Sequence, residues 1–83
     1  MSLNVALVSP TEQVWTGEAK FVLARTTGGD LGVHPGHTPL FGVLVDGLVS
    51  IEVADGSKKE FNVKGGFLSV NNDRVSILTE SVA

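Results

Sequence analysis

Turn-forming residues recur along the whole sequence at short, nearly regular intervals. Most intervals are about 7–11 residues long, which leaves room for a short strand but not for a long helix. The turn signals are Ser9-Pro10, Gly17, Gly28-Gly29, Pro35-Gly36, Asp46-Gly47, Asp55-Gly56, Gly65-Gly66 and residues 71–73 (Asn-Asn-Asp). This rhythm is typical of a β-sandwich or a β-barrel and argues against a helical bundle.

Between the turns, apolar and polar residues alternate as they do in half-buried strands. The apolar positions that share one face are Leu3, Val5 and Leu7; Val49, Ile51 and Val53; and Phe61 and Val63. Residues 20–24 and 40–45 are apolar on both faces, so each segment is either central or in contact with something outside the domain. No segment has the 3.6-residue period of an amphipathic helix.

These patterns predict one all-β domain over residues 1–83, with roughly eight to ten short strands in two packed, mainly antiparallel sheets. We expect hairpin turns at residues 55–56 and 71–73, because Gly, Asn and Asp tolerate the positive φ that tight hairpins need. Hydrophobic residues make up 42% of a chain whose interior is small, so we also expect a protein partner to cover part of the surface.

Composition excludes several classes of protein. The chain has no cysteine, and so no disulfides, thiolate zinc ligands or cysteine nucleophiles. A net charge of −3 argues against binding nucleic acid through its phosphates. No apolar run is long enough for a membrane span, and residues 1–13 lack the basic region and cleavage site of a signal peptide. We therefore expect an intracellular protein.

Residues 26–40 hold both histidines and two of the three prolines. A metal site of Asp30, His34 and His37 has suitable residue types, but Pro35-Gly36 forces a turn between the histidines. A phosphate loop has the glycines, yet lacks the Gly-Lys-Ser/Thr ending and a following helix. We favour a rigid recognition loop, because proline and sharp glycine turns reduce the entropy lost on binding.

Other chemistry finds little support. There is no Gly-x-Ser-x-Gly motif, and the glutamates stand singly among polar neighbours, as solvated carboxylates do. Trp15 and the four phenylalanines are scattered without interleaved bases, so we interpret them as core residues. Lys58 and Lys59 lie beside the turn at residues 55–56, which leaves a lipoyl or biotinyl carrier domain as the alternative function.

Several blocks of sequence occur together in one known family, in the same order. They are residues 8–10 (Val-Ser-Pro), 14–19 (Val-Trp-Thr-Gly-Glu-Ala), 29–40 (Gly-Asp-Leu-Gly-Val-His-Pro-Gly-His-Thr-Pro-Leu), 46–51 (Asp-Gly-Leu-Val-Ser-Ile), 63–70 (Val-Lys-Gly-Gly-Phe-Leu-Ser-Val) and 75–80 (Val-Ser-Ile-Leu-Thr-Glu). The blocks span nearly the whole chain. The sequence resembles the N-terminal domain of the F-type ATP synthase ε subunit family.

The resemblance implies a flattened ten-stranded β-sandwich and a non-catalytic part of a rotor, without a cofactor. Domains of this family lie at the foot of the central stalk. They bind the γ subunit through one side and the membrane c-ring through the base, with indirect contact to the α/β head. Proton flow turns the ring, and the ε subunit helps to pass that rotation to the head. The implied location is peripheral, on the cytoplasmic side of the bacterial inner membrane and not inserted in it.

The family pattern also assigns residues. Its ring-facing acidic turn matches Asp30, Leu31 and Gly32, and its histidine after Pro-Gly matches His37, near the γ-contacting edge. We expect Asp30 to face basic groups on the ring. His34 stands where the family usually has a large apolar or tyrosine side chain, and Phe41 where leucine is common. The family's C-terminal helical hairpin is absent from the sequence, so neither inhibition nor ATP binding is transferred.

Overall fold

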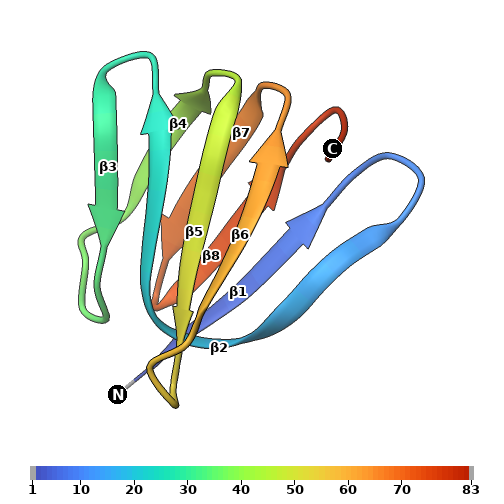
Figure 1. Cartoon of the computed structure of the whole chain (residues 1–83). Helices are drawn as coiled ribbons and strands as arrows, with labels where there is room; N and C mark the ends of the chain where they lie inside the picture. Colours follow the sequence, from blue (N-terminus) through green and yellow to red (C-terminus); the bar gives the residue numbers. More distant parts are fainter. Residues whose placement is uncertain (1, 83) are drawn as a thin grey trace.

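The computed structural model describes residues 2–82, which form two packed layers of strands (Figure 1). The strands are β1 (Leu3–Val8), β2 (Gln13–Thr26), β3 (Gly29–Val33), β4 (Leu40–Leu44), β5 (Gly47–Val53), β6 (Lys58–Val63), β7 (Gly66–Asn71) and β8 (Arg74–Leu78). One layer contains β4, β7, β8 and β1, and the other contains β3, β2, β5 and β6. All pairings are antiparallel except that of β1 with β8.

Strand β2 joins the two layers. Its first half pairs with β1, from Gln13 to Ala19, and its second half pairs with β5 and β3. The register shifts between Ala19 and Phe21, where an extra residue produces a β-bulge. Ala19 and Val22 are therefore both buried, although three positions separate them, and the strand passes from one layer to the other without a turn.

The predicted all-β sandwich is confirmed, and residues 2–82 contain no helix. Residues 2–82 form eight strands, which lies within the eight to ten predicted from the turn spacing and is two fewer than the ten that the resemblance implied. Gly17, predicted as a turn, lies inside the long strand β2, where the ring of Trp15 occupies the space that a Cβ would need. Among the described residues, no helix is long and apolar enough to cross a membrane.

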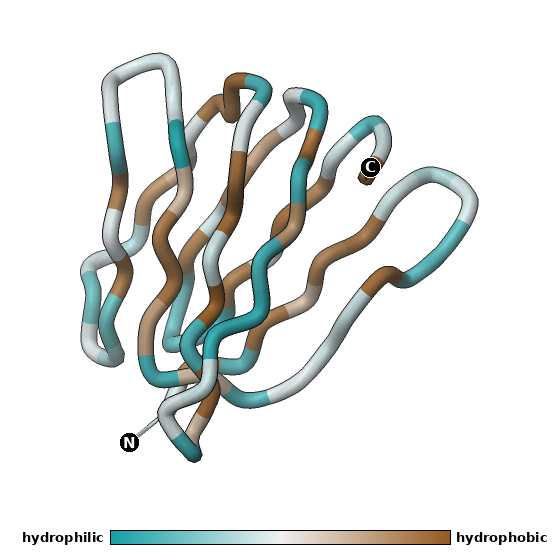
Figure 2. The backbone as a smooth tube through the Cα atoms, in the orientation of Figure 1, coloured by the Kyte–Doolittle hydropathy of each residue, from teal (hydrophilic) through white to brown (hydrophobic). Residues whose placement is uncertain are grey.

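The core lies between the layers and consists of the inward positions of every strand. Its buried residues are Leu3, Val5, Leu7, Ala19, Val22, Ala24, Val33, Leu44, Val49, Ile51, Val63, Leu68, Val70, Val75 and Ile77. The predicted alternation is confirmed in β1, where all three inward residues are buried. Hydrophobic residues lie along the strands and hydrophilic residues mark most of the turns (Figure 2).

Both predicted hairpin turns are confirmed. Asn72 and Asp73 adopt φ values of 49° and 61° between β7 and β8, and Gly56 has a φ of 90° between β5 and β6. Asp55 accepts hydrogen bonds from the hydroxyl and the backbone N–H of Ser57. These bonds stabilise the carboxylate and lower the pKa of Asp55 below its ordinary value.

Residues after β8 cross to the edge of β6. The Thr79 N–H donates to the carbonyl oxygen of Val8 at 3.0 Å, and the Lys64 N–H donates to that of Ser81 at 3.0 Å. Val82 then forms an isolated bridge with Val63. This segment ties the end of β1 to the end of β6, and so connects the two layers on the side opposite β3.

Candidate functional site

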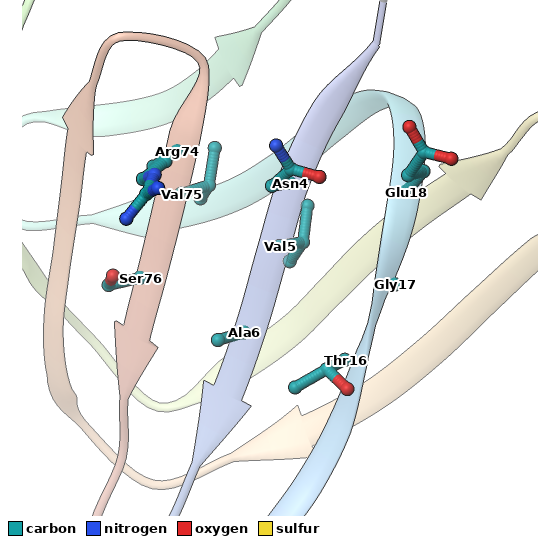
Figure 3. A pocket seen from close by; sticks show the side chains of 9 residues that line it. All are labelled: Asn4, Val5, Ala6, Thr16, Gly17, Glu18, Arg74, Val75 and Ser76. Atoms are coloured by element: carbon teal, nitrogen blue, oxygen red, sulfur yellow. The ribbon is translucent and has the colours of Figure 1, made fainter.

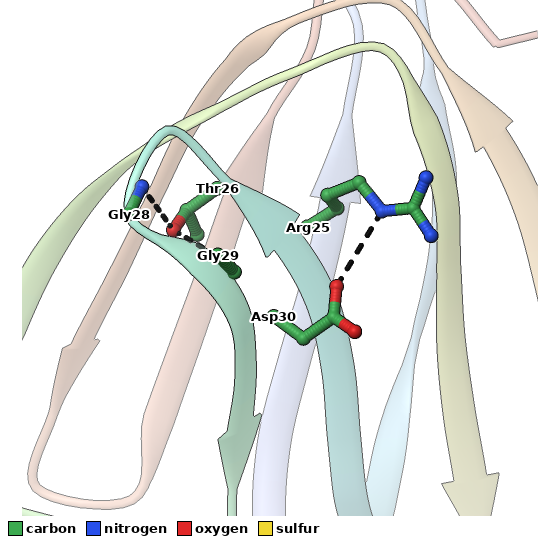
Figure 4. A network of polar contacts seen from close by, with 5 residues as sticks. All are labelled: Arg25, Thr26, Gly28, Gly29 and Asp30. Atoms are coloured by element: carbon green, nitrogen blue, oxygen red, sulfur yellow. Dashed lines mark hydrogen bonds and ion pairs between the residues drawn. The ribbon is translucent and has the colours of Figure 1, made fainter.

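The β2–β3 hairpin positions the first group of predicted site residues. The Thr26 hydroxyl accepts from the Gly28 N–H at 3.1 Å and donates to the Gly29 carbonyl at 2.8 Å, which closes the turn (Figure 4). Arg25 and Asp30 face each other across the two strands, with 3.4 Å between Nε and Oδ1. Both side chains are more than 60% exposed, so this ion pair adds little to stability.

Asp30, Leu31 and Gly32 lie in strand β3 and not in a turn, which corrects the sequence-based expectation. The turn precedes them at residues 27–28, because the Thr26 hydroxyl closes the chain there. Only Asp30 presents its side chain to solvent, whereas Leu31 packs against the core. Gly32 lies under the Phe21 ring, and a Cβ on Gly32 would stand 2.8 Å from that ring.

Residues 34–39 form the loop that follows β3. The His37 N–H donates to the His34 carbonyl at 3.2 Å, and the His37 imidazole Nδ1 donates to the Thr38 carbonyl at 2.7 Å. The Gly36 N–H donates to Asp73 Oδ1 at 2.7 Å, which ties the loop to the β7–β8 turn. The loop is therefore anchored by a contact 37 positions away in the sequence.

We predict that Asp73→Ala destabilises the fold by about 1–3 kcal/mol. The substitution leaves the Gly36 N–H without its partner and places alanine at a φ of 61°. Asp73→Asn is the matched control, since asparagine keeps an Oδ1 acceptor and tolerates this φ. Urea denaturation followed by circular dichroism measures the free energy of unfolding of both variants. Equal stability of the alanine variant and the wild type would contradict the anchoring role of Asp73.

The structure does not bring the candidate metal ligands together. Asp30 pairs with Arg25, the His34 ring lies 4.5 Å from the Phe21 ring, and the His37 imidazole is bonded to its own loop. No group of three or more His, Asp or Glu side chains among residues 2–82 could hold a metal ion.

The lysines of the carrier alternative are not at a hairpin tip. Lys58 and Lys59 stand in β6, paired in register with Glu52 and Ile51. The turn itself lies before them, at residues 54–57. The geometry thus gives no support to a carrier domain that presents a modified lysine on a turn.

The outer face of the β4–β7–β8 layer carries a contiguous apolar patch. Val43, Phe67 and Leu78 lie side by side in register across the three strands, and they are 45%, 48% and 53% exposed. Phe41, 63% exposed, stacks on Phe67 with 5.4 Å between the ring centroids. We refer to these four residues as the apolar patch. Exposed apolar side chains gathered in this way are typical of an interaction surface.

A hollow of about 620 Å³ adjoins the apolar patch. Its walls are Val43, Phe67 and Leu78 on one side and the residues after β1, including Pro10, on the other. Gly66 forms part of its wall, and Glu80 is the only charged residue in the lining. The lining of the hollow is therefore mainly apolar.

The expectation that the aromatic residues are core material is wrong for Phe41 and Phe67. The alternating pattern already contained the signal: with Leu68 and Val70 inside, Phe67 must point out. The same logic puts Phe41 and Val43 outside once Leu44 is buried. Residues 40–45, predicted to be apolar on both faces, thus expose one of these faces at Phe41 and Val43.

The fold and this surface define a β-sandwich domain with an exposed apolar patch on the outer face of one sheet, a class suited to docking on another protein. Residues 2–83 match the family described as ATP synthase, δ/ε chain, β-sandwich domain. The chain therefore belongs to the ATP synthase δ/ε chain family.

Relatives with more than 45% identity support this assignment. The chain is 51% identical to the ATP synthase epsilon chain of Streptomyces coelicolor over 78 residues, which cover 94% of this chain but only 63% of that relative. It is 49% identical to the ATP synthase epsilon chain of Frankia casuarinae over 81 residues, covering 98% of this chain and 95% of that relative. The chain thus spans less than two thirds of some relatives and nearly all of another.

Solved structures show the same fold. A chain of the Euglena gracilis mitochondrial ATP synthase, in a structure of OSCP, F1 and the c-ring, superimposes with a TM-score of 0.93 at 26% identity. The match covers 99% of this chain and 52% of that one. A chain from the central stalk and c-ring of the Tetrahymena thermophila mitochondrial ATP synthase has a TM-score of 0.82 at 20% identity, covering 100% and 66%, and shows the fold alone.

Proposed function

We propose that this chain is a non-catalytic rotor subunit of the central stalk, which links the γ subunit to the c-ring so that proton-driven rotation is coupled to ATP synthesis. It lies peripherally, on the cytoplasmic side of the bacterial inner membrane. Membership in the δ/ε family and the likeness to a chain of the Euglena structure of OSCP, F1 and the c-ring support this role. The apolar patch is the single observation that carries it, because a docking subunit needs such a surface.

The apolar patch is the proposed docking site for γ. Its two stacked phenylalanines are large, rigid side chains that lose little entropy on binding. The neighbouring hollow offers a place for an apolar side chain of γ. His37 follows Pro35-Gly36 in the loop that leads into β4, and we propose that it lies at the edge of this contact.

The tip of the β2–β3 hairpin is the proposed contact with the c-ring. Asp30 is exposed and its carboxylate is already shared with Arg25. A basic group on the ring would therefore compete with, or join, an existing exposed ion pair. Charge pairs of this kind set orientation and association rate more than affinity. We propose that Asp30, with Leu31 and Gly32 beside it in β3, fixes how the domain sits on the ring.

We predict that Asp30→Lys weakens binding of the γ-bound domain to the c-ring by about threefold to tenfold and lowers ATP-driven proton pumping, with the fold intact. Like charge replaces a complementary one, while the exposed side chain contributes little to stability. The readouts are proton pumping in reconstituted membranes and thermal unfolding. Glu12→Lys, at an exposed position outside the hairpin, is the matched control. Proton pumping at the wild-type rate by the Asp30→Lys variant would contradict a role of Asp30 in the contact with the ring.

The assembly itself is tested by co-purification. The wild-type chain is expected to recover γ and the c-ring together in one stoichiometric complex and to hydrolyse no ATP by itself. Recovery of neither partner would contradict the rotor role.

A further inference from the structure

The sheet face that carries the apolar patch also has a polar end. Arg74 on β8 pairs in register with Asn4 on β1, and Asn4 pairs with Glu18 on β2. All three side chains are exposed on the same face as Leu78, two side-chain rows further along β8. Arg74 and Glu18 lie on either side of Asn4, with Ala6 and Thr16 in the neighbouring row (Figure 3).

Small residues leave this end of the face hollowed. A cavity of about 430 Å³ lies over Ala6, Gly17 and Ser76, with Arg74 and Glu18 on its walls. A second cavity of about 640 Å³ lies on the other side of Arg74, among asparagine and serine side chains. The guanidinium thus stands between two hollows that protein groups of a partner could enter.

The two charges are available to a partner. Within residues 2–82 the one ion pair is that of Arg25 with Asp30, so the Arg74 guanidinium has no carboxylate within 4 Å. Glu18 accepts a single hydrogen bond, from the Ser2 hydroxyl at 2.9 Å. Because one strand separates them, Arg74 and Glu18 are about 10 Å apart, or two strand spacings.

We propose that Arg74 and Glu18 are specificity-determining residues of the docking face. The protein partner that covers the apolar patch extends over this polar end, and it places a carboxylate against Arg74 and a basic group against Glu18. This inference rests on the proposed function and adds a chemical description of the partner's surface. Apolar contact supplies most of the affinity, and the charge pair selects one orientation.

The pair selects one orientation of the partner because its positive end, Arg74, lies on β8 and its negative end, Glu18, lies on β2. A partner rotated by half a turn, or shifted by two strands, would bring like charges together, and such juxtapositions at an interface cost several kcal/mol. The apolar patch alone lacks this discrimination, because four hydrophobic side chains accept many approach angles. The complementary groups on the partner must therefore be about 10 Å apart and in fixed order.

Stopped-flow association with γ at low salt tests the proposal. Arg74→Glu and Glu18→Lys are each expected to slow association by about tenfold, less at high salt, without changing thermal stability. The double variant Arg74→Glu/Glu18→Lys keeps the net charge of the wild type. It is expected to associate more slowly than either single variant, because both local pairs are reversed. Lys58→Glu, on the other layer, is the control and should leave the rate nearly unchanged.

The outcomes separate this inference from the proposed function. If the wild-type chain binds γ but the two single variants associate at the wild-type rate, the assignment of Arg74 and Glu18 is wrong and the proposed function stands. A double variant restored to the wild-type rate also overturns it, because net charge alone then governs association. Failure of the wild-type chain to bind γ overturns both.

Discussion

Replacing Gly66 with alanine is expected to cost about 3–5 kcal/mol of stability, the largest effect of any single substitution considered for this chain. Gly66 has a φ of 114°, where residues with a Cβ are strained. A Cβ there would also overlap the backbone carbonyl of Leu78, which belongs to the neighbouring strand and cannot rotate away. A domain of 83 residues has only about 4–12 kcal/mol in total, so this one substitution should remove a large fraction of the stability.

Gly65→Asn provides the matched control. Gly65 has a φ of 60°, which asparagine tolerates, and a Cβ there would meet its nearest neighbours at ordinary contact distances of 3.8 Å and 3.9 Å. Urea denaturation should therefore separate the two variants by at least about 2 kcal/mol. Equal midpoints for both would mean that the β7–β8 pairing at this end is not as close as described.

The double substitution Phe41→Thr/Phe67→Thr is expected to weaken binding to γ by about 2–4 kcal/mol, or roughly 30-fold to 1,000-fold. Both rings are about half or more exposed and stacked on each other, so their loss removes the centre of the apolar patch but little of the core. Threonine keeps a high preference for strands, so the fold should persist. Surface plasmon resonance with immobilised γ measures the affinity.

Leu48→Thr is the control for this prediction. Leu48 is 54% exposed on β5, on the outer face of the other layer, and its substitution removes a comparable exposed hydrophobic side chain. Binding to γ should be unchanged within about twofold. If Leu48→Thr weakens binding as much as the double variant does, the docking surface lies on the β5 side and not on β4 and β7.

Much of the fold was predictable from the sequence because local rules decide it. Alternation placed Leu3, Val5 and Leu7 in the core, and the backbone preferences of Asn and Asp fixed the β7–β8 turn. The prediction of a turn at Gly17 was wrong, because a glycine can allow close packing as well as form a turn. Here it makes room for Trp15 within an unbroken strand, and the strand count falls accordingly.

The candidate site was predictable only in part. The family motif indicated Asp30 and His37, but it placed Asp30 in a turn, whereas Asp30 lies in β3. The sequence did not show that the turn closes earlier, at residues 27–28, through the Thr26 hydroxyl. The apolar patch joins side chains from β4, β7 and β8, so it depends on strand order, which a single sequence does not contain. The hydrogen bond between Gly36 and Asp73 could not be predicted either, because it also depends on how distant strands are arranged.

Isothermal titration calorimetry of the wild-type chain with isolated γ tests the central claim most directly. We predict saturable binding at one chain per γ, with a negative heat-capacity change that reports burial of apolar surface. The same titration with Phe41→Thr/Phe67→Thr should show a smaller heat-capacity change and an affinity lower by roughly 30-fold to 1,000-fold. Absence of binding by the folded wild-type chain, or equal binding by the double variant, would contradict the assignment of this sheet face to γ.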